Sequence, residues 1–163
     1  MKALFLSFFL AIGMVSAKAQ EANNVDKITA SYISLKDALV GSNATLAKSR
    51  SKELLAALST PVKGLKPAQQ KLMTTYLAKL QYDSRHISET TVIDHQREHF
   101  ASLSKNMYAL VSGLKMNSTT LYQQYCPMKK ASWLSDAEDV RNPYYGDDML
   151  ECGKVTATLK GVK

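Results

Sequence analysis

The sequence predicts an all-α fold, namely an antiparallel four-helix bundle with an irregular C-terminal cap. Between about residues 26 and 115, apolar residues recur every three or four positions in four successive stretches, which is the period of an amphipathic helix. The stretches have similar lengths and short connections, as in antiparallel bundles. From about residue 118 to 157 this period is lost, turn residues replace it, and no ladder of strands is apparent.

The first two helices have recognisable ends. The first begins near Asp26, and its apolar face consists of Ile28, Tyr32, Leu35 and Leu39. Gly41 ends this helix because glycine readily adopts the backbone that closes a helix, and Ser42 or Asn43 can cap the next. The second helix continues to about Ser59 along Leu46, Ala47, Leu54, Leu55 and Leu58.

A turn marked by two prolines and a glycine separates the second helix from the third, for which Pro67 suits the first position. The inner side of the third helix carries Leu72, Tyr76, Leu80, Asp83 and Ile87. After a break near residues 88–91, a fourth helix extends to about Lys115. Its apolar stripe consists of Ile93, Phe100, Leu103, Met107, Leu110 and Leu114.

The tail after the fourth helix contains three weaker signals. Residues 119–125 are predicted to form a short extended piece, and residues 155–159 a short strand or a fraying end. Residues 135–140 are predicted to form a helical turn, with Ser135 as its cap and Glu138 three residues later. A tail of this length without regular structure is usually functional or cross-linked.

Residues 1–19 are predicted to be a secretory signal peptide. Lys2 gives a positive start, residues 3–15 form an apolar run, and Ala17 and Ala19 are small residues suited to cleavage after Ala19. The alternative is an uncleaved anchor, but the run is shorter than the roughly 20 residues of a spanning helix. We therefore expect residues 20–163 to be one periplasmic domain without a membrane span.

Charge and motifs argue against two large functional classes. Removing Lys2 and Lys18 with the leader lowers the formal net charge from +7 to +5. The lysines are scattered and form no basic run, which argues against nucleic-acid binding. The chain also lacks a nucleophile elbow, a phosphate-binding loop and a dinucleotide fingerprint, so we do not expect an enzyme.

Two sulfur pairs are candidate metal ligands: Cys126 with Met128, and Met149 with Cys152. Thiolates and thioethers are soft ligands that suit monovalent copper or silver. Core packing is the alternative for both methionines, because methionine fills irregular gaps. In an oxidising compartment the default for the cysteines is a disulfide. It would close a loop of about 27 residues and contribute about 3–4 kcal/mol.

The three histidines, His86, His95 and His99, lie within fourteen residues. His95 and His99 are four apart on the fourth helix, so one face presents both, and a short turn brings His86 near them. The alternative is three surface histidines. Residues 95–99 also match the inverted zinc-protease pattern H-x-x-E-H. That pattern predicts a small zinc hydrolase with Glu98 as base, and it requires a third ligand from a downstream glutamate.

The tail resembles a specific family. The matching motifs are Cys126-Pro127-Met128, Trp133-Leu134-Ser135, Asn142-Pro143-Tyr144-Tyr145-Gly146 and Met149-Leu150-x-Cys152-Gly153, together with Arg97-Glu98-His99-Phe100. They resemble an uncharacterised bacterial periplasmic domain that occurs alone and also attached to adaptor subunits of heavy-metal efflux pumps. The resemblance extends from Asp26 to Val155. It implies a metal-handling role by association with copper or silver export.

We therefore expect periplasmic binding of a soft metal ion, copper(I) or silver(I), for chaperoning or for delivery to heavy-metal efflux. The expected ligands are Cys126, Met128, Met149 and Cys152, completed by His86, His95 or His99. The alternative is a disulfide-stapled interaction module that docks an efflux adaptor or another envelope partner. Trp133, Tyr144 and Tyr145 are expected to pack the tail against the helices.

Overall fold

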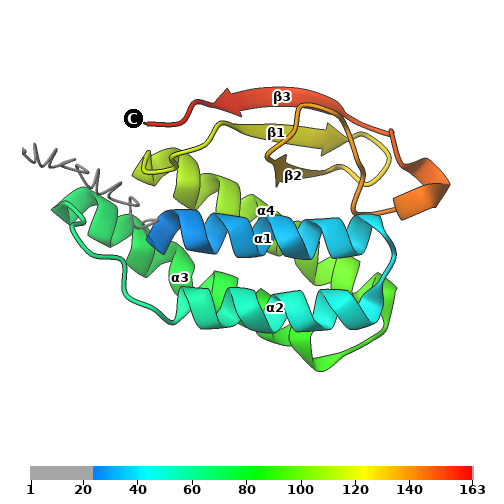
Figure 1. The fold of residues 1–163 in the computed structure, drawn as a ribbon, viewed down its shortest axis with the longest axis horizontal. Coiled ribbons are helices and arrows are strands. Elements are labelled where there is room, and N and C mark those ends of the chain that lie inside the picture. Colours follow the sequence, from blue (N-terminus) through cyan, green and yellow to red (C-terminus); the bar gives the residue numbers. More distant parts are fainter. Residues whose placement is uncertain (1–23, 163) are drawn as a thin grey trace, which may run out of the picture.

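A computed structural model describes residues 24–162; the predicted signal peptide, residues 1–19, lies outside this range. The fold consists of four helices followed by a small sheet (Figure 1). The helices are α1 (Asn24–Val40), α2 (Ala44–Leu58), α3 (Pro67–Glu89) and α4 (Ile93–Leu114). The strands are β1 (Leu121–Cys126), β2 (Ala131–Ser135) and β3 (Lys154–Leu159), with a 3-10 helix, η1 (Gly146–Met149), before β3.

The four predicted helices are confirmed, and so are the end signals at Asn43 and Pro67. At the end of α1 the left-handed residue is Ser42, with φ of 50°, rather than the predicted Gly41. The Asn43 side chain accepts a hydrogen bond from the Leu46 amide at 2.9 Å, so Asn43 caps α2. Pro67 occupies the start of α3, where its missing N–H leaves no bond unmade. Lys115 closes α4 in the left-handed conformation, and its amide donates to the Val111 carbonyl. The starts at Asn43 and Pro67 follow from local chemistry, which explains why sequence patterns predicted them, whereas no pattern predicted a left-handed lysine at the end of α4.

The all-α prediction is confirmed only in part: four helices make up most of the described residues, but the predicted irregular cap is a three-stranded antiparallel sheet of order β2-β1-β3. Gln124 in the central strand lies opposite Trp133 in β2 and Val155 in β3. The extended piece predicted at 119–125 is confirmed, and so is the strand alternative at 155–159. Each strand has only five or six residues, which is too short for a clear alternation of apolar and polar residues. The pairing of β3 with β1 also joins residues about thirty positions apart, so the local sequence does not predict it.

The helical turn predicted at residues 135–140 is wrong. The side-chain amide of Gln124, buried in β1, donates to the carbonyls of Ala137, Glu138 and Asp139 at 2.9–3.1 Å. The backbone therefore bends around a side chain from the neighbouring strand instead of bonding to itself. This is a contact across the sheet, and the capping pattern at Ser135 carries no information about it.

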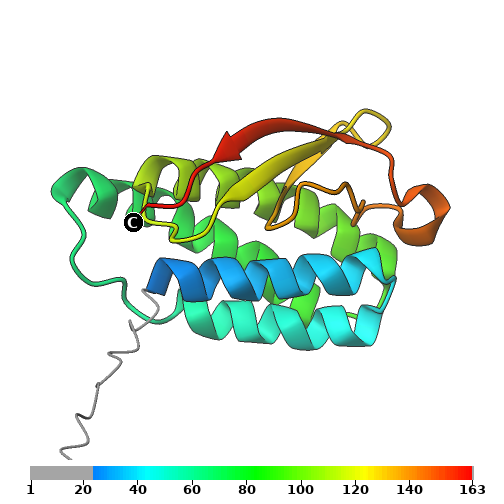
Figure 2. The same cartoon turned by 45° about the horizontal axis from the view of Figure 1, so that its top comes forward.

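The sheet lies along one side of the helices (Figures 1 and 2). Each helix packs mainly on its neighbour in sequence, whereas α1 and α4 make few direct contacts and β2 packs on α4. The hydroxyl of Tyr32 in α1 bonds to Ser104 Oγ in α4 at 2.6 Å and accepts from the Leu134 amide of β2 at 3.1 Å. The sheet thus joins the first and last helices.

A chain of buried aromatic rings holds the tail against the helices. Tyr32 stacks on Phe100 at 5.4 Å between centroids, Phe100 contacts Tyr144 at 5.9 Å, and Tyr144 meets Trp133 edge-on at 5.8 Å. Trp133 and Phe100 are fully buried. The predicted packing role of Trp133 and Tyr144 is confirmed, and Tyr145 is partly buried against the same core.

Arg97 anchors the segment that precedes η1. Its guanidinium is buried and donates to the Pro143 carbonyl at 3.0 Å and to Ser42 Oγ at 2.9 Å. Gly146 lies against the same group with φ of 58°, and an added Cβ would meet Ser42 Oγ and stand 2.9 Å from Arg97 Nη2. The two sequence motifs around Arg97 and Asn142–Gly146 are therefore parts of one structural contact.

Among residues 24–162, no helix is both long enough and apolar enough to cross a membrane.

Candidate metal centre

The three histidines form one cluster between α3 and α4. His86 lies in the last turn of α3, and His95 and His99 lie one turn apart near the start of α4. Only residues 90–92 connect the two helices, so the chain folds back and brings the three side chains together. One ring nitrogen from each histidine lies within 4.8 Å of the others. The predicted proximity of His86 to the other two is confirmed.

The cluster is close to the dimensions of a metal site. The rings of His86 and His99 are stacked with centroids 4.6 Å apart, and His95 meets His99 edge-on at 4.7 Å. A tetrahedral ion about 2.0–2.1 Å from each nitrogen would separate the nitrogens by about 3.3 Å. Rotating the side chains would close the remaining gap, which is about 1.5 Å at most.

Asp83 supports the cluster from behind. Its side chain is 5% exposed, and its Oδ1 lies 3.1 Å from Nδ1 of His99. A carboxylate that accepts from one ring nitrogen leaves the other nitrogen free for a metal and fixes the orientation of the ring. The helical period of the sequence places Asp83 on the inner side of the third helix but gives it no role. The signal was a carboxylate within an apolar stripe.

The solvent side of the cluster is partly covered by Tyr82. This exposed ring lies 4.4 Å from the ring of His86 and 6.0 Å from that of His99, measured between centroids. His95 is the most open of the three histidines, with a side chain 45% exposed. A hollow of about 330 Å³ beside the cluster is lined by Ala78, Lys79, Tyr82, Asp83, Ser102 and Asn106. The exposure of His95 leaves the cluster open to solvent on its side.

The zinc-hydrolase pattern is only partly reproduced. The pattern requires a downstream glutamate as third ligand, but the third side chain beside His95 and His99 is His86, which precedes them. Within residues 24–162, no glutamate joins the three histidines. Glu98 is 77% exposed, and its closest approach to the cluster is 3.9 Å, from Oε2 to Nδ1 of His95. The arrangement suits ion binding better than activation of a water held inside a cleft.

The two cysteines meet elsewhere, at the end of β1 and just before β3. Their sulfurs lie 3.5 Å apart as free thiols. Cys126 is buried, and Cys152 is partly exposed. The contact matches the predicted pairing of these residues, and the disulfide itself stays a prediction.

Met128 and Met149 are exposed rather than packed in the core, at 62% and 39% respectively. The core-packing alternative is therefore wrong for both. Within the described range, neither cysteine joins the histidine cluster. The three histidines and the two cysteines are therefore two separate groups of candidate ligands. The sequence predicts instead a single site in which sulfur and histidine ligands bind the same ion.

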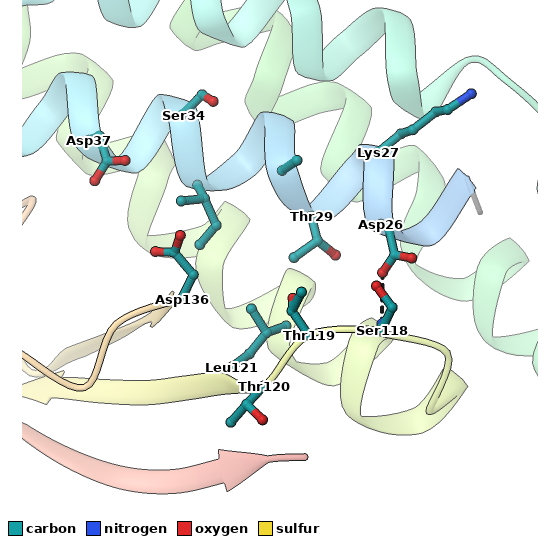
Figure 3. A pocket seen from close by; sticks show the side chains of 12 residues that line it. Asp26, Lys27, Thr29, Ser34, Asp37, Ser118, Thr119, Thr120, Leu121 and Asp136 are labelled. Atoms are coloured by element: carbon teal, nitrogen blue, oxygen red, sulfur yellow. Dashed lines mark hydrogen bonds between the residues drawn. The ribbon is translucent and has the colours of Figure 1, made fainter. Parts of the chain in front are cut away.

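A third feature, a groove between α1 and the start of β1, was missed by sequence analysis (Figure 3). Its volume is about 700 Å³, and its apolar lining residues include Ile33 and Leu121. Asp26, Asp37 and Asp136 lie around it, and Asp26 Oδ1 accepts from the Ser118 amide at 2.9 Å. No sequence signal pointed to this groove because its two walls lie about ninety residues apart.

The fold and site define a four-helix protein with a small antiparallel sheet and a three-histidine cluster between its last two helices. The chain belongs to the family described as "Protein of unknown function (DUF3347)", whose model matches residues 28–119. This match contains all three histidines and ends before β1, so the tail motifs lie outside it. No curated protein and no solved structure shows significant similarity to the chain.

Proposed function

We propose that this protein binds a transition-metal ion, copper foremost, at His86, His95 and His99. The observation that carries the proposal is the convergence of three imidazoles from two helices, with the carboxylate of Asp83 behind one of them. Three nitrogen ligands on rigid helices form a preorganised half-site, and solvent access leaves a position for an incoming or departing ligand. The protein works by ligand exchange and forms no covalent bond with a substrate.

Copper is a candidate because imidazole suits copper, as it suits zinc, iron and nickel. Copper(I) also accepts the three-coordinate geometry that three histidines offer. Silver(I) is the related candidate, since it shares the preference of copper(I) for soft ligands. The exposed thioethers of Met128 and Met149 and the two thiols are a second set of soft ligands, on the tail.

The proposed setting is the periplasm, and the proposed role is delivery of the ion to a heavy-metal efflux system. The signal-like residues 1–19 and the resemblance of the tail to domains attached to efflux adaptors support this setting. A partly exposed site favours hand-over, because a receiving protein can replace one histidine at a time. A mildly basic chain does not attract cations, so ligand chemistry must provide the affinity.

The test is a competition titration of copper(I) against a chromophoric chelator, with the reduced mature protein and a parallel titration of zinc. The triple variant His86→Ala, His95→Ala, His99→Ala is compared with Cys126→Ser, Cys152→Ser. We expect one ion per chain, lost in the histidine variant and kept in the cysteine variant. Loss only in the cysteine variant would move the site to the tail. No competition by any form would remove the metal function.

Zinc chemistry has its own readout. If zinc binds more tightly than copper(I), the hydrolase alternative becomes the one to pursue. In that case Glu98→Gln must abolish hydrolysis while zinc stays bound, because Glu98 would be the general base of the H-x-x-E-H pattern.

An interaction module is the second candidate function, and the groove between α1 and β1 favours it. The test is co-migration of the mature protein with the periplasmic part of a heavy-metal efflux adaptor. Ala30 is exposed and lines the groove, whereas Ala56 is exposed on α2. Ala30→Arg is expected to abolish co-migration and Ala56→Arg to leave it unchanged. Equal behaviour of the two variants would argue against the groove as the docking surface.

A further inference from the structure

Cys126 and Cys152 lie close enough to form a disulfide, and the histidine site does not involve either of them. Cys126 is the last residue of β1, and Cys152 lies two residues before β3, so the antiparallel pairing of these strands brings the two thiols to the same end of the sheet. Their sulfurs are 3.5 Å apart. Forming a disulfide, with a bond of about 2.05 Å, requires a closure of about 1.5 Å. Small side-chain rotations are sufficient for such a closure.

The two thiols lie in different surroundings. Cys126 is buried, and the Lys129 amide in the β1–β2 turn donates to its sulfur at 3.4 Å. Cys152 is partly exposed. Its backbone is held on both sides: its amide donates to the Met149 carbonyl at 3.0 Å, and its carbonyl accepts from Asn142 Nδ2 at 2.7 Å. One sulfur is thus available to reagents from solvent, and the other is shielded and hydrogen-bonded.

We propose that Cys126 and Cys152 form a reversible thiol–disulfide exchange site, in which Cys152 reacts with external disulfides and thiols and Cys126 is the buried resolving partner. The proposal rests on the sulfur contact and on the unequal exposure of the two residues, and it does not depend on metal binding. The external reactant is a small or protein-borne disulfide when the pair is oxidised, and a thiol when it is reduced.

The chemistry balances in both directions. In oxidation, the Cys152 thiolate attacks an external disulfide RS–SR, which forms a Cys152–SR mixed disulfide and releases one thiolate. The Cys126 thiolate then attacks Cys152 Sγ, which forms the internal disulfide and releases the second thiolate. Two protein thiols lose two protons and two electrons, and RS–SR becomes two RSH. In reduction, an external thiolate RS⁻ attacks Cys152 Sγ, which forms the Cys152–SR mixed disulfide while Cys126 leaves as a thiolate. A second external thiolate then attacks the external sulfur of this mixed disulfide, which forms RS–SR and releases the Cys152 thiolate.

The pKa directions of the two thiols support the reductive direction of this exchange. Burial alone would raise the pKa of Cys126, but hydrogen bonds from the Lys129 amide, Asn142 and Cys152 outweigh it and lower that pKa below the ordinary thiol value. The hydrogen bond with Cys126, aided by burial, raises the pKa of Cys152. A thiol with the lower pKa is the better leaving group. Reduction therefore favours attack at Cys152 with departure of Cys126.

The exchange would change how the tail is held. The bond would join the end of β1 to the segment that contains η1, which is otherwise tied down by Arg97 and Asn142. When the pair is reduced, Met128 and Met149 are exposed close in sequence to two free thiols. When it is oxidised, neither thiol can bind a soft ion. Oxidation state would thus control the soft ligands of the tail without affecting the histidines.

The test uses the full mature protein in buffers of defined ratios of reduced to oxidised glutathione. Free thiols are counted, and adducts are identified by intact mass. We expect the wild type to pass reversibly between two free thiols and none, without a lasting adduct. Cys126→Ser is expected to retain one glutathione on Cys152. Cys152→Ser is expected to remain unmodified as long as it is folded, because Cys126 is buried.

Three outcomes would overturn the proposal. Two free thiols that persist in oxidised glutathione would exclude exchange. A disulfide that forms but resists native-state reduction would make the pair a static staple. Faster modification of Cys152→Ser than of Cys126→Ser would reverse the assigned roles. Circular dichroism of each variant establishes folding, and Cys126→Ala replaces Cys126→Ser if the buried hydroxyl prevents folding.

Discussion

The histidine cluster and the cysteine pair are built in opposite ways. The histidines come from fourteen residues of sequence, and a helical period together with a three-residue connection is enough to bring them together. The cysteines are 26 positions apart, and they meet only because β1 pairs with β3. The first group is therefore a local product of two helices, whereas the second depends on the sheet. Changes to the tail should affect the cysteines more than the histidines.

Helix α4 lies between the two regions and contacts both of them. One side of it carries His95 and His99 toward α3, while another carries Arg97, Phe100 and Ser104 toward the tail and α1. Because different sides of α4 contact α3 and the tail, a change on one side can leave the side chains on the other side in place. The two regions should therefore respond separately to the changes below, which run from the largest expected effect to the smallest.

Trp133→Ala should have the largest effect on stability. It removes a fully buried indole from the aromatic chain between tail and helices and should lower the free energy of unfolding by about 3–5 kcal/mol. Chemical denaturation measures this loss. Trp133→Phe should cost less, and Tyr82→Ala, at an exposed ring, should change stability by less than about 0.5 kcal/mol. Equal losses for Trp133→Ala and Tyr82→Ala would contradict the role of the indole.

Oxidation of the cysteine pair should have the next largest effect. Closing the loop between Cys126 and Cys152 should raise the free energy of unfolding by about 3–4 kcal/mol, since it restricts the unfolded chain. Urea denaturation of the oxidised and reduced protein measures the difference, and Cys126→Ser should abolish it. Copper affinity at the histidines should be the same in both states. A parallel change in that affinity would show that the two regions are coupled.

Asp83→Asn should act on the histidine cluster alone. It removes the charge that faces His99 Nδ1 and should weaken metal binding about 10–100-fold. The chelator competition measures this change. Glu98→Gln is the matched control, because it removes one negative charge from an exposed position beside His95, and its effect should be small. If Asp83→Glu restores the metal affinity, the carboxylate acts by orienting the His99 ring. If Asp83→Asn and Glu98→Gln weaken metal binding equally, the effect is one of charge in general.

Titration of the reduced thiols should give a smaller but diagnostic signal. The pair should release its first proton below the ordinary thiol pKa and its second above it, because the pKa of Cys126 is lowered and that of Cys152 is raised; both values belong to the coupled pair. Ultraviolet absorbance of the thiolate follows both steps. The denatured protein should show one unresolved step. One step in the native protein would contradict the asymmetry.

The linked stability effect has opposite signs for the two cysteines. The lowered pKa of Cys126 contributes stability above the ordinary thiol pKa, and this contribution is lost as the pH falls through the lowered value. The raised pKa of Cys152 contributes below the ordinary value, and it is lost as the pH rises through the raised one. Because Cys126 is the main cause of the raised pKa of Cys152, Cys126→Ser should remove that contribution, whereas Cys152→Ser should leave Cys126 with the hydrogen bonds from Lys129 and Asn142 that lower its pKa.

Sequence patterns alone determined the four helices, the cap of α2 at Asn43, the start of α3 at Pro67 and the proximity of the three histidines. These features depend on residues within a few turns of one another, where the helical period and backbone hydrogen bonding leave few alternatives. The same reasoning found Trp133 and Tyr144 as packing residues, because large aromatics in a tail without helical period must be buried somewhere.

Only the tertiary structure decided the sheet, the separation of the sulfur pair from the histidines, and the role of Asp83. Strand pairing between β1 and β3 depends on contacts across about thirty residues, and short strands carry too little local alternation to reveal their partners. The bend at residues 136–139 likewise depends on the Gln124 amide from another strand. The contact of Asp83 with His99, sixteen positions away, forms only when α3 packs on α4. The sequence alone therefore does not show which residue pairs with this buried carboxylate.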